Sequence, residues 1–315
     1  MIRLGLLFGG RSAEREVSIA GARGVEMALD KNRYQIKRYD AAKDIDKLVK
    51  DSPGLDCVFV LLHGRYGEDG TVQGLLDLLD IPYQGSGVLG SALAMDKHLS
   101  KVVYKDAGIN TPDWLHLTGA SLADEEAIKK RLGLPVMVKP CNQGSSVGIK
   151  IIRHEEEILP GVEQALKWDD EIIVEQFITG REITGGVIGL DKLEALPIVE
   201  IIPDRAKYEF FDFEAKYKPG ATREICPADL PDTITKRAQE LALTAHKALK
   251  LSGYSRTDMI VDEAGEIFVI ETNTIPGMTP TSLFPQAAAA AGLDFSKLLD
   301  RLIEMAIESK KQNRD

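Results

Sequence analysis

The N-terminal part of the chain alternates between short apolar runs and amphipathic stretches. Residues 2–8 are largely apolar, and a glycine pair separates them from a helical stretch that extends to Leu29. A second apolar run, at 56–62, precedes a loop and a predicted helix at about 70–79. Repeated strand–loop–helix units of this kind predict a parallel α/β sheet.

The middle of the chain has β-branched runs on either side of a loop rich in glycine and serine. We expect a helix near 96–108, then strands at Val136–Lys139 and Gly148–Ile152. A helix around 155–167 and a strand at Glu171–Gln176 follow. Two strands joined by a short glycine-containing loop indicate an antiparallel pair.

The C-terminal part combines strands with long helices. We expect strands at 183–190 and 195–202, a loop around 204–224, and helices at 231–251 and 295–309. A chain of 315 residues is long for one core and is expected to form two or three domains. The expected domains are 1–95, an N-terminal α/β domain; 96–180, a central part; and 181–315, a C-terminal part.

Composition narrows the class of protein. Hydrophobic residues make up 44% and charged residues 28%, as in an ordinary globular protein. The net charge of −10 disfavours long-range attraction to nucleic acid or anionic lipid. No run approaches the roughly 20 apolar residues of a membrane span. The three widely spaced cysteines give neither a disulfide framework nor a zinc pattern, so a cytoplasmic location is expected.

The most specific pattern is R-T-D-M-I-V-D-E-A-G-E-I-F-V-I-E-T-N at residues 256–273. Two apolar runs flank D-E-A-G, which is a hairpin signal. If the turn is symmetric about its Ala–Gly pair, Asp258 lies opposite Glu271, and Asn273 shares the face of Glu271. These oxygen donors suit Mg²⁺, and Arg256 adds a positive charge on the same face. The alternative is a solvated polar face on an edge hairpin.

The second informative segment is V-M-V-K-P-C-N-Q-G-S-S-V-G-I-K. Lys139 ends a strand, and Gly144, Ser145, Ser146 and Gly148 let backbone N–H groups approach an anion. No G-K-[ST] leads into a helix, so this is not a Walker P-loop. The loop looks like a flap over a triphosphate, and an ordinary flexible hairpin loop is the alternative.

Further candidates stand at strand ends. Glu175 and Glu182 are placed to contact an adenosine, or else are two exposed glutamates. Glu14 lies in the first strand–helix connection, where it either pairs with a substrate ammonium or favours the helix N-terminus through the dipole. His63 follows the second strand, at the sheet edge where ligands bind.

Together these features resemble the ATP-grasp fold. More narrowly, G-G-R-S-A-E-R-E-V-S, L-H-G-R-Y-G-E-D-G, M-D-K, G-S-S-V-G, E-A-K-Y, C-P-A and E-T-N-T-I-P-G-M-T-P-T-S-L resemble the D-alanine–D-alanine ligase family, in order from residue 9 to 283. The resemblance implies an N-terminal parallel α/β domain followed by two ATP-grasp subdomains. It implies ATP-dependent joining of two D-alanine molecules through an acyl phosphate, for peptidoglycan precursor synthesis. It also implies ATP, two Mg²⁺ ions with Mn²⁺ as a substitute, and a homodimer.

The resemblance also assigns the substrate contacts. Glu14 would hold the ammonium of the first D-alanine, in a network with Ser145 and Tyr217, and His63 would lie near its carboxylate. At the reacting carbonyl, the expected oxyanion hole is formed by Arg256 and the Gly277 N–H. The carboxylate of the second D-alanine is expected to bind Ser282 and the Leu283 N–H.

The same resemblance assigns the nucleotide and metal contacts. The expected phosphate contacts are Lys97, Lys139 and Lys216, with Gly144 and Ser146 in the flap. The expected adenosine contacts are Glu175 and Glu182. The expected metal ligands are Asp258, Glu271 and Asn273.

Other functions are distinguished by particular residues. A D-alanine–D-lactate ligase or another carboxylate–amine ligase would differ around Tyr217 and at Ser282–Leu283. A nucleotide-binding regulatory protein without catalysis is disfavoured by the intact set of Arg256 and the three metal candidates. A dinucleotide oxidoreductase is excluded because G-x-G-x-x-G is missing after the first strand.

Overall fold

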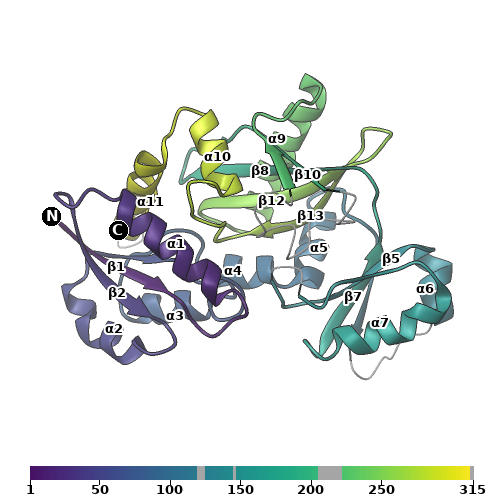
Figure 1. Cartoon of the computed structure of the whole chain (residues 1–315), viewed down its shortest axis with the longest axis horizontal. Helices are drawn as coiled ribbons and strands as arrows, with labels where there is room; N and C mark the ends of the chain where they lie inside the picture. Colours follow the sequence, from purple (N-terminus) through teal and green to yellow (C-terminus); the bar gives the residue numbers. More distant parts are fainter. Residues whose placement is uncertain (119–124, 145–146, 205–221, 313–315) are drawn as a thin grey trace.

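The computed structural model describes residues 1–118, 125–144, 147–204 and 222–312, arranged around three β-sheets (Figure 1). The first is a parallel sheet of order β2–β1–β3, which confirms the predicted parallel α/β architecture. Its strands are β1 (Ile2–Phe8), β2 (Tyr34–Asp40) and β3 (Cys57–Val60). The helices of this part are α1 (Arg15–Ala28), α2 (Ile45–Asp51), α3 (Thr71–Leu78) and α4 (Val88–Met95), with a 3₁₀ turn, η1 (Ser52–Gly54).

The second sheet is antiparallel, with strand order β4–β7–β5–β6. Its strands are β4 (Trp114–Thr118), β5 (Val136–Pro140), β6 (Lys150–Ile152) and β7 (Glu171–Gln176). The antiparallel β5–β6 pair around the glycine-rich loop was predicted and is confirmed. The helices that accompany it are α5 (Lys97–Asp106), α6 (Glu125–Leu132) and α7 (Ile158–Ala165), the last preceded by η2 (Glu155–Glu157).

The third sheet is also antiparallel and has the order β11–β10–β8–β12–β13, with β9 paired to β8. Its strands are β8 (Arg181–Gly189), β9 (Glu194–Ala195), β10 (Val199–Pro203), β11 (Thr222–Ile225), β12 (Gly253–Val261) and β13 (Ile267–Asn273). Its helices are α9 (Asp232–Ala248), α10 (Leu283–Ala290) and α11 (Phe295–Gln312). The single strand expected at 195–202 is therefore divided between β9 and β10.

The β12–β13 hairpin contains a bulge that its sequence did not predict. Next to the turn, Val261 pairs with Ile267 and Met259 with Val269, which is one residue out of the symmetric register. The register shifts between Asp258 and Met259, so Asp258 does pair with Glu271. The predicted pairing is confirmed, but the bulge, rather than a symmetric turn, produces it.

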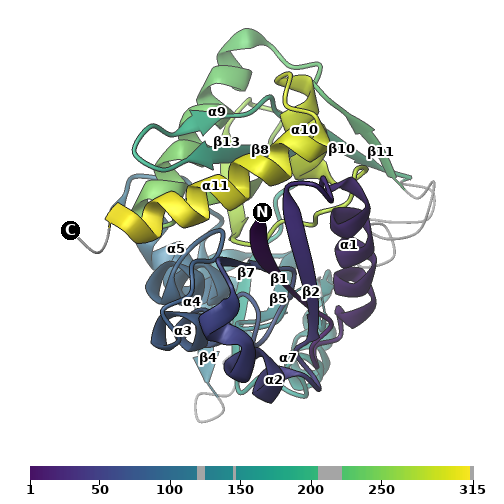
Figure 2. The ribbon, with the colours of Figure 1, turned by 90° about the vertical axis from the view of Figure 1, so that its left-hand side faces the viewer.

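The hydrophobic cores do not follow the order of the chain. The last helix, α11, packs against α1 and β3, and Leu298, Leu299 and Leu302 share a core with Leu4 and Leu6 of β1. Figure 2 shows α11 lying across the molecule beside these N-terminal elements. The four-stranded sheet has its own core, in which α7 packs against β5 and β6 and α6 packs against β7.

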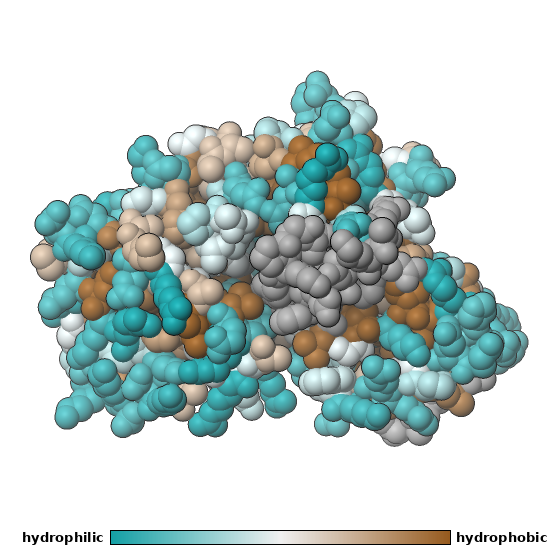
Figure 3. Space-filling model, in the orientation of Figure 1, coloured by the Kyte–Doolittle hydropathy of each residue, from teal (hydrophilic) through white to brown (hydrophobic). Residues whose placement is uncertain are grey.

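The glycine pair in β8 brings two helices close to the third sheet. A Cβ at Gly185 would come within 3.0 Å of Ala242 on α9, and one at Gly186 within 3.2 Å of Phe284 on α10. Glycine therefore sets the packing distance of both helices. The face shown in Figure 3 is mostly hydrophilic, with hydrophobic residues in scattered groups. Among the described residues, no helix has the length and apolar character needed to cross a bilayer.

Candidate active site

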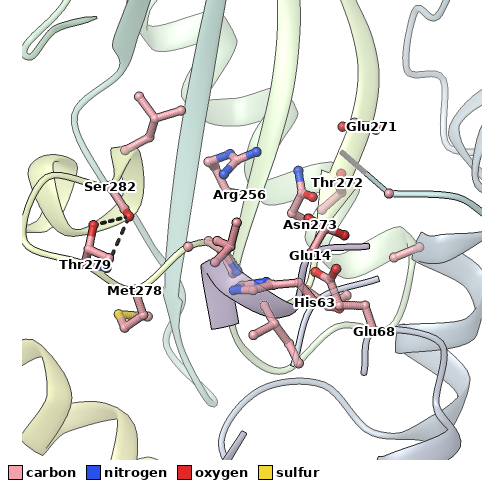
Figure 4. Close-up of a pocket in the computed structure, with 18 of the residues that line it drawn as sticks. Glu14, His63, Glu68, Arg256, Glu271, Thr272, Asn273, Met278, Thr279 and Ser282 are labelled. Carbon is pink, nitrogen blue, oxygen red and sulfur yellow. Dashed lines mark hydrogen bonds between the residues drawn. The ribbon is translucent and has the colours of Figure 1, made fainter. Parts of the chain in front are cut away.

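A cavity of about 460 Å³ lies where loops from the first and third sheets meet the glycine-rich loop. It collects most of the predicted site residues that the structure describes. Those lining it are Glu14, His63, Lys97, Gly144, Arg256, Glu271, Asn273, Gly277, Ser282 and Leu283. In Figure 4, Ser282 and Thr279 lie on one side of this cavity and Glu14, His63 and Glu68 on the other.

Glu14 is buried between two loops that come from different sheets. It stands immediately before α1, and its side chain makes no capping bond to that helix. A Cβ at Gly64 would lie 2.8 Å from Glu14 Oε2, and one at Gly144 would lie 2.6 Å from the same atom. The two glycines therefore leave room for the Glu14 carboxylate. The glycine-rich loop therefore lies against the first strand–helix connection. The predicted roles of Gly144 in the flap and of Glu14 at the substrate ammonium both need this arrangement.

His63 and Glu68 are buried beside Glu14 and both contact the backbone of Ile275. Burial lowers the pKa of His63, and the charge of Glu14 opposes this. Burial, and next the charge of Glu14, raise the pKa of Glu68 to about 8, although the Gly64 N–H donates to Glu68 Oε2 at 2.7 Å. At neutral pH both groups are therefore largely uncharged, and the carboxyl of Glu68 is mostly protonated.

Arg256 and Asp258 form a bidentate ion pair, with Nε–Oδ1 2.9 Å and Nη2–Oδ2 2.8 Å. Thr184 Oγ1 donates to Asp258 Oδ1 at 2.6 Å, and Asn273 Nδ2 donates to Asp258 Oδ2 at 3.2 Å. Glu271, which pairs with Asp258 across the hairpin, lines the cavity. The predicted metal candidates are thus gathered as two carboxylates and an amide, an all-oxygen donor set that fits Mg²⁺ chemistry.

The start of α10 faces the other side of the cavity. Ser282 is the N-cap of this helix and Leu283 is its first residue, so the Leu283 N–H lies at the positive end of the helix dipole. Ser282 Oγ accepts from the Thr279 N–H at 3.2 Å and contacts Thr279 Oγ1 at 2.7 Å. A Cβ at Gly277 would lie 3.1 Å from Ser282 Oγ. This side of the cavity suits a carboxylate.

The predicted nucleotide contacts are divided between two places. Lys97 lines the cavity and donates to the Gln143 carbonyl at 2.6 Å. Lys139 and Glu175 lie outside the cavity lining and form a buried ion pair with each other. Glu175 is 2% exposed, so the alternative of an exposed glutamate is wrong for this residue. Glu182 is half-buried on β8.

Four of the predicted site residues lie outside the described residues. They are Ser145, Ser146, Lys216 and Tyr217.

A second group of possible metal ligands lies at the edge of the four-stranded sheet. The ligand atoms of His116, Cys141 and Glu171 are within 4.8 Å of one another. His116 Nε2 is only 2.7 Å from Glu171 Oε2. Nitrogen and oxygen ligands at about 2.0–2.2 Å from one tetrahedral zinc would lie more than 3 Å apart. The contact is therefore a hydrogen bond, and this group is not arranged around an ion.

Sequence reasoning missed two buried charged residues near these sites, Glu68 and Lys101. Glu68 is part of the quoted motif L-H-G-R-Y-G-E-D-G, and its position beyond a buried strand was the available signal. Lys101 lies on α5, and its sequence neighbours give no sign that it is buried against Glu175.

Known proteins match the chain over almost its whole length. Residues 39–86 match the family described as D-ala D-ala ligase N-terminus, and residues 103–304 match D-ala D-ala ligase C-terminus. The D-alanine--D-alanine ligase of Syntrophobacter fumaroxidans is 56% identical over 307 residues, with 98% of each chain covered. That of Desulfotalea psychrophila is 53% identical over 311 residues, with 98% of this chain and 96% of the relative covered.

Solved structures agree with these matches. The D-alanine--D-alanine ligase of Bacillus anthracis complexed with ATP has a TM-score of 0.87 at 38% identity, covering 99% of this chain and 100% of that chain. The VanG D-Ala:D-Ser ligase of Enterococcus faecalis has a TM-score of 0.82 at 32% identity, covering 97% and 99%. The expected ATP-grasp architecture is confirmed, and the chain belongs to the D-alanine–D-alanine ligase family.

Proposed function

We propose that the protein joins two D-alanine molecules into D-alanyl-D-alanine, using ATP and releasing ADP and phosphate. One observation carries this proposal: a single cavity has the Glu14 carboxylate on one side and the Ser282–Leu283 helix start on the other, with Arg256 in its lining. An ammonium suits the first side and a carboxylate the second. Two small zwitterions can therefore be held at opposite ends of one site. The names of the relatives supply D-alanine as the amino acid.

In the first half-reaction, a carboxylate must acquire a better leaving group than hydroxide. The first D-alanine carboxylate attacks the γ-phosphorus of ATP, an O–P bond forms, and the bond to the β-phosphate breaks to release ADP. Glu14 holds the ammonium of this substrate, and Ser145 and Tyr217 complete its network. His63 lies near the carboxylate of this substrate. It is neutral there because burial lowers its pKa.

In the second half-reaction, the amine of the second D-alanine attacks the acyl phosphate. The amine loses a proton, a C–N bond forms, and the C–O bond to phosphate breaks. Arg256 and the Gly277 N–H stabilise the tetrahedral oxyanion, and one such donor is typically worth about 3–4 kcal/mol. The Ser282 hydroxyl and the Leu283 N–H hold the carboxylate of the second substrate, supported by the position of both at the start of α10.

The bound nucleotide is proposed to be ATP, which the Bacillus anthracis relative binds in its solved structure. Two Mg²⁺ ions, or Mn²⁺ in their place, would be held by Asp258, Glu271 and Asn273 and would neutralise phosphate charge. The proposed phosphate contacts are Lys97, Lys139, Lys216, Gly144 and Ser146, and the proposed adenosine contacts are Glu175 and Glu182.

The segment that carries Lys216 and Tyr217 is proposed to exclude water, because an acyl phosphate hydrolyses when water enters.

The remaining expectations concern organisation. We propose the ranges 1–95, 96–180 and 181–315 as the functional domains, supported by one sheet in each. A homodimer is supported by exposed apolar side chains on the neighbouring helices α3 and α4, namely Leu78, Val88 and Leu89. A cytoplasmic location follows from the use of ATP, and the product would serve peptidoglycan precursor synthesis.

The test is ATP-dependent phosphate release with a panel of D-amino acids, with the dipeptide product identified by mass spectrometry. D-Alanine is expected to give ADP and D-alanyl-D-alanine in equal amounts. The Glu271→Gln variant is expected to fold normally and lose nearly all ADP formation, because it loses one anionic metal ligand. Near-wild-type turnover by this variant at low Mg²⁺ would remove the hairpin from the active site.

A second function is suggested by the VanG relative, which is a D-Ala:D-Ser ligase. D-Serine and D-lactate are therefore run as second substrates in the same assay at pH 6–9. We expect little ester product, because D-lactate is a net anion and a neutral Tyr217 phenol adds no charge to attract it. Efficient D-alanyl-D-lactate synthesis at pH 7 would overturn the choice of second substrate and leave the ligase chemistry standing.

A further inference from the structure

Three buried charges, Lys101, Glu175 and Lys139, form a row beside the glycine-rich loop. Lys101 Nζ lies 2.8 Å from Glu175 Oε2, and Lys139 contacts the other carboxylate oxygen, Oε1. Their exposed fractions are only 1%, 2% and 5%. Burial lowers the pKa of Lys101, and the charge of Glu175 opposes this. With both lysines protonated, Glu175 is a single carboxylate shared by two ammonium groups, and the row has one positive charge in excess.

The two lysines differ in how firmly they are held. Lys101 Nζ donates to Thr111 Oγ1 at 2.8 Å and to the Pro112 carbonyl at 3.0 Å, in addition to its contact with Glu175. An ammonium has three N–H groups, so Lys101 has an oxygen neighbour for each. Among the described residues, Lys139 has one such neighbour, Glu175. Lys139 therefore keeps N–H groups that a ligand can use, and Lys101 does not.

Charge alone would hold Lys139 on Glu175 if the two formed an isolated buried pair. Burial opposes ionisation of Glu175, but Lys101 and Lys139 together hold its pKa below the ordinary value. Because Lys101 stays in place, Glu175 keeps a counter-ion when Lys139 turns away. An unpaired buried carboxylate would be costly, and the movement of Lys139 does not create one.

We propose that Lys101 is a positioning residue of the nucleotide site: it is the fixed counter-ion of Glu175 and thereby frees Lys139 to exchange Glu175 for a nucleotide phosphate. This inference rests on the proposed function, in which Lys139 is a phosphate contact. Lys101 acts through Glu175 and does not itself touch the nucleotide. Its position on α5, bonded to the connection before β4, keeps it in place during that exchange.

The proposal makes the affinity for ATP depend on the net charge of the row. The wild type has a net charge of +1. Lys101→Gln has a net charge of 0, and its amide can still donate to Thr111 and Pro112. The double variant Lys101→Gln/Glu175→Gln returns to +1. If Lys101 served packing alone, Lys101→Gln would weaken binding equally with and without the Glu175 carboxylate.

The experiment is calorimetric titration of each variant with ATP and Mg²⁺, without D-alanine. Lys101→Gln is expected to weaken binding by about tenfold or more when Glu175 is present, and by less than about threefold when it is added to Glu175→Gln. Because Glu175 is itself a proposed adenosine contact, the double variant is compared with the single variant Glu175→Gln, so that the loss of this contact cancels. Lys105→Met is the control: Lys105 lies one turn later on α5, exposed and paired with Asp113, and its loss is expected to leave affinity unchanged. A thermal melt without nucleotide confirms that each variant is folded. Lys101→Met is a second neutral substitution, and it is expected to weaken ATP binding as Lys101→Gln does.

Two results would overturn this inference and leave the proposed function standing. One is wild-type affinity in folded Lys101→Gln or Lys101→Met. The other is a loss of affinity from Lys101→Gln that is as large in the Glu175→Gln background as in the wild type. Absence of ATP binding by the wild type is a different result, which overturns the proposed function and this inference with it.

Discussion

At the residue scale, the charged groups of the cavity lie at two ends, one of which favours a positive ligand group and the other a negative one. Glu14 is a buried carboxylate at one end, while Arg256 and the start of α10 provide positive potential elsewhere in the lining. Because His63 and Glu68 are largely uncharged at neutral pH, they do not cancel this polarity. The lining thus favours a zwitterion in one orientation.

The charge of Glu14 is testable by a change that keeps its size. Glu14→Gln is expected to raise KM for the first D-alanine by about tenfold or more and to change KM for ATP little, because a carboxylate in a closed site interacts strongly with an ammonium. The measurement is steady-state kinetics with each substrate varied in turn. An equal rise in both KM values would point to a structural role at the start of α1.

The raised pKa of Glu68 gives a pH-dependent prediction for stability. Glu68 ionises near 4.5 in the unfolded chain and near 8 in the folded protein, so it contributes stability at low pH that is lost as pH rises through this window. Glu68→Gln imitates the protonated acid at every pH. The melting temperature of this variant, relative to wild type, is expected to rise between pH 5 and pH 8. A difference that does not change with pH would show that Glu68 is ionised in the folded protein.

Single residues were predictable where their role depends on local spacing. Asp258, Glu271 and Asn273 follow from strand alternation, and Glu14 follows from its place after the first strand. The pairing of Glu175 with Lys101 and Lys139 was not predictable, because it joins α5, β5 and β7 across the fold. Burial of charge is a tertiary property that no local pattern encodes.

At the element scale, apolar runs identified the strands with hydrophobic residues on both faces. β2 reads Y-Q-I-K-R-Y-D and was missed, since only its first and sixth residues are fully buried. β4 was not predicted, and β11 begins inside the loop expected around 204–224. These short or edge strands are specified by their partners more than by their own sequences. The bulge at Asp258 has the same origin.

The contact between the glycine-rich loop and the first strand–helix connection can be tested by adding a side chain at Gly144. In Gly144→Ala the new Cβ would meet the tip of the flexible Glu14 side chain, so the fold can adapt but the carboxylate must move. KM for D-alanine is expected to rise several-fold, with a melting temperature close to wild type. Gly54→Ala, where a Cβ meets nothing within 4 Å, is the control. Unchanged kinetics in Gly144→Ala would separate this loop from the substrate site.

At the scale of the whole molecule, the cavity and the largest core both join distant parts of the chain. The N-terminal sheet and α11 form one hydrophobic cluster that continues into Tyr254 and Phe284 of the third part. Separation of the first and last parts would expose this cluster. The central sheet, in contrast, is built around the separate cluster of α6, α7 and β5–β7. We therefore expect two units of folding, one of which contains both ends of the chain.

Two tryptophans make this expectation measurable, because Trp114 and Trp168 both lie in the central part. Leu299→Ala removes a fully buried side chain from the core that α11 shares with β1, at an expected cost of about 2–5 kcal/mol. It should lower the main unfolding transition seen by circular dichroism and shift tryptophan fluorescence less. Ile172→Ala, fully buried in the central core, should do the reverse. Coincident shifts of both signals in both variants would instead show that the central sheet unfolds together with the rest of the molecule.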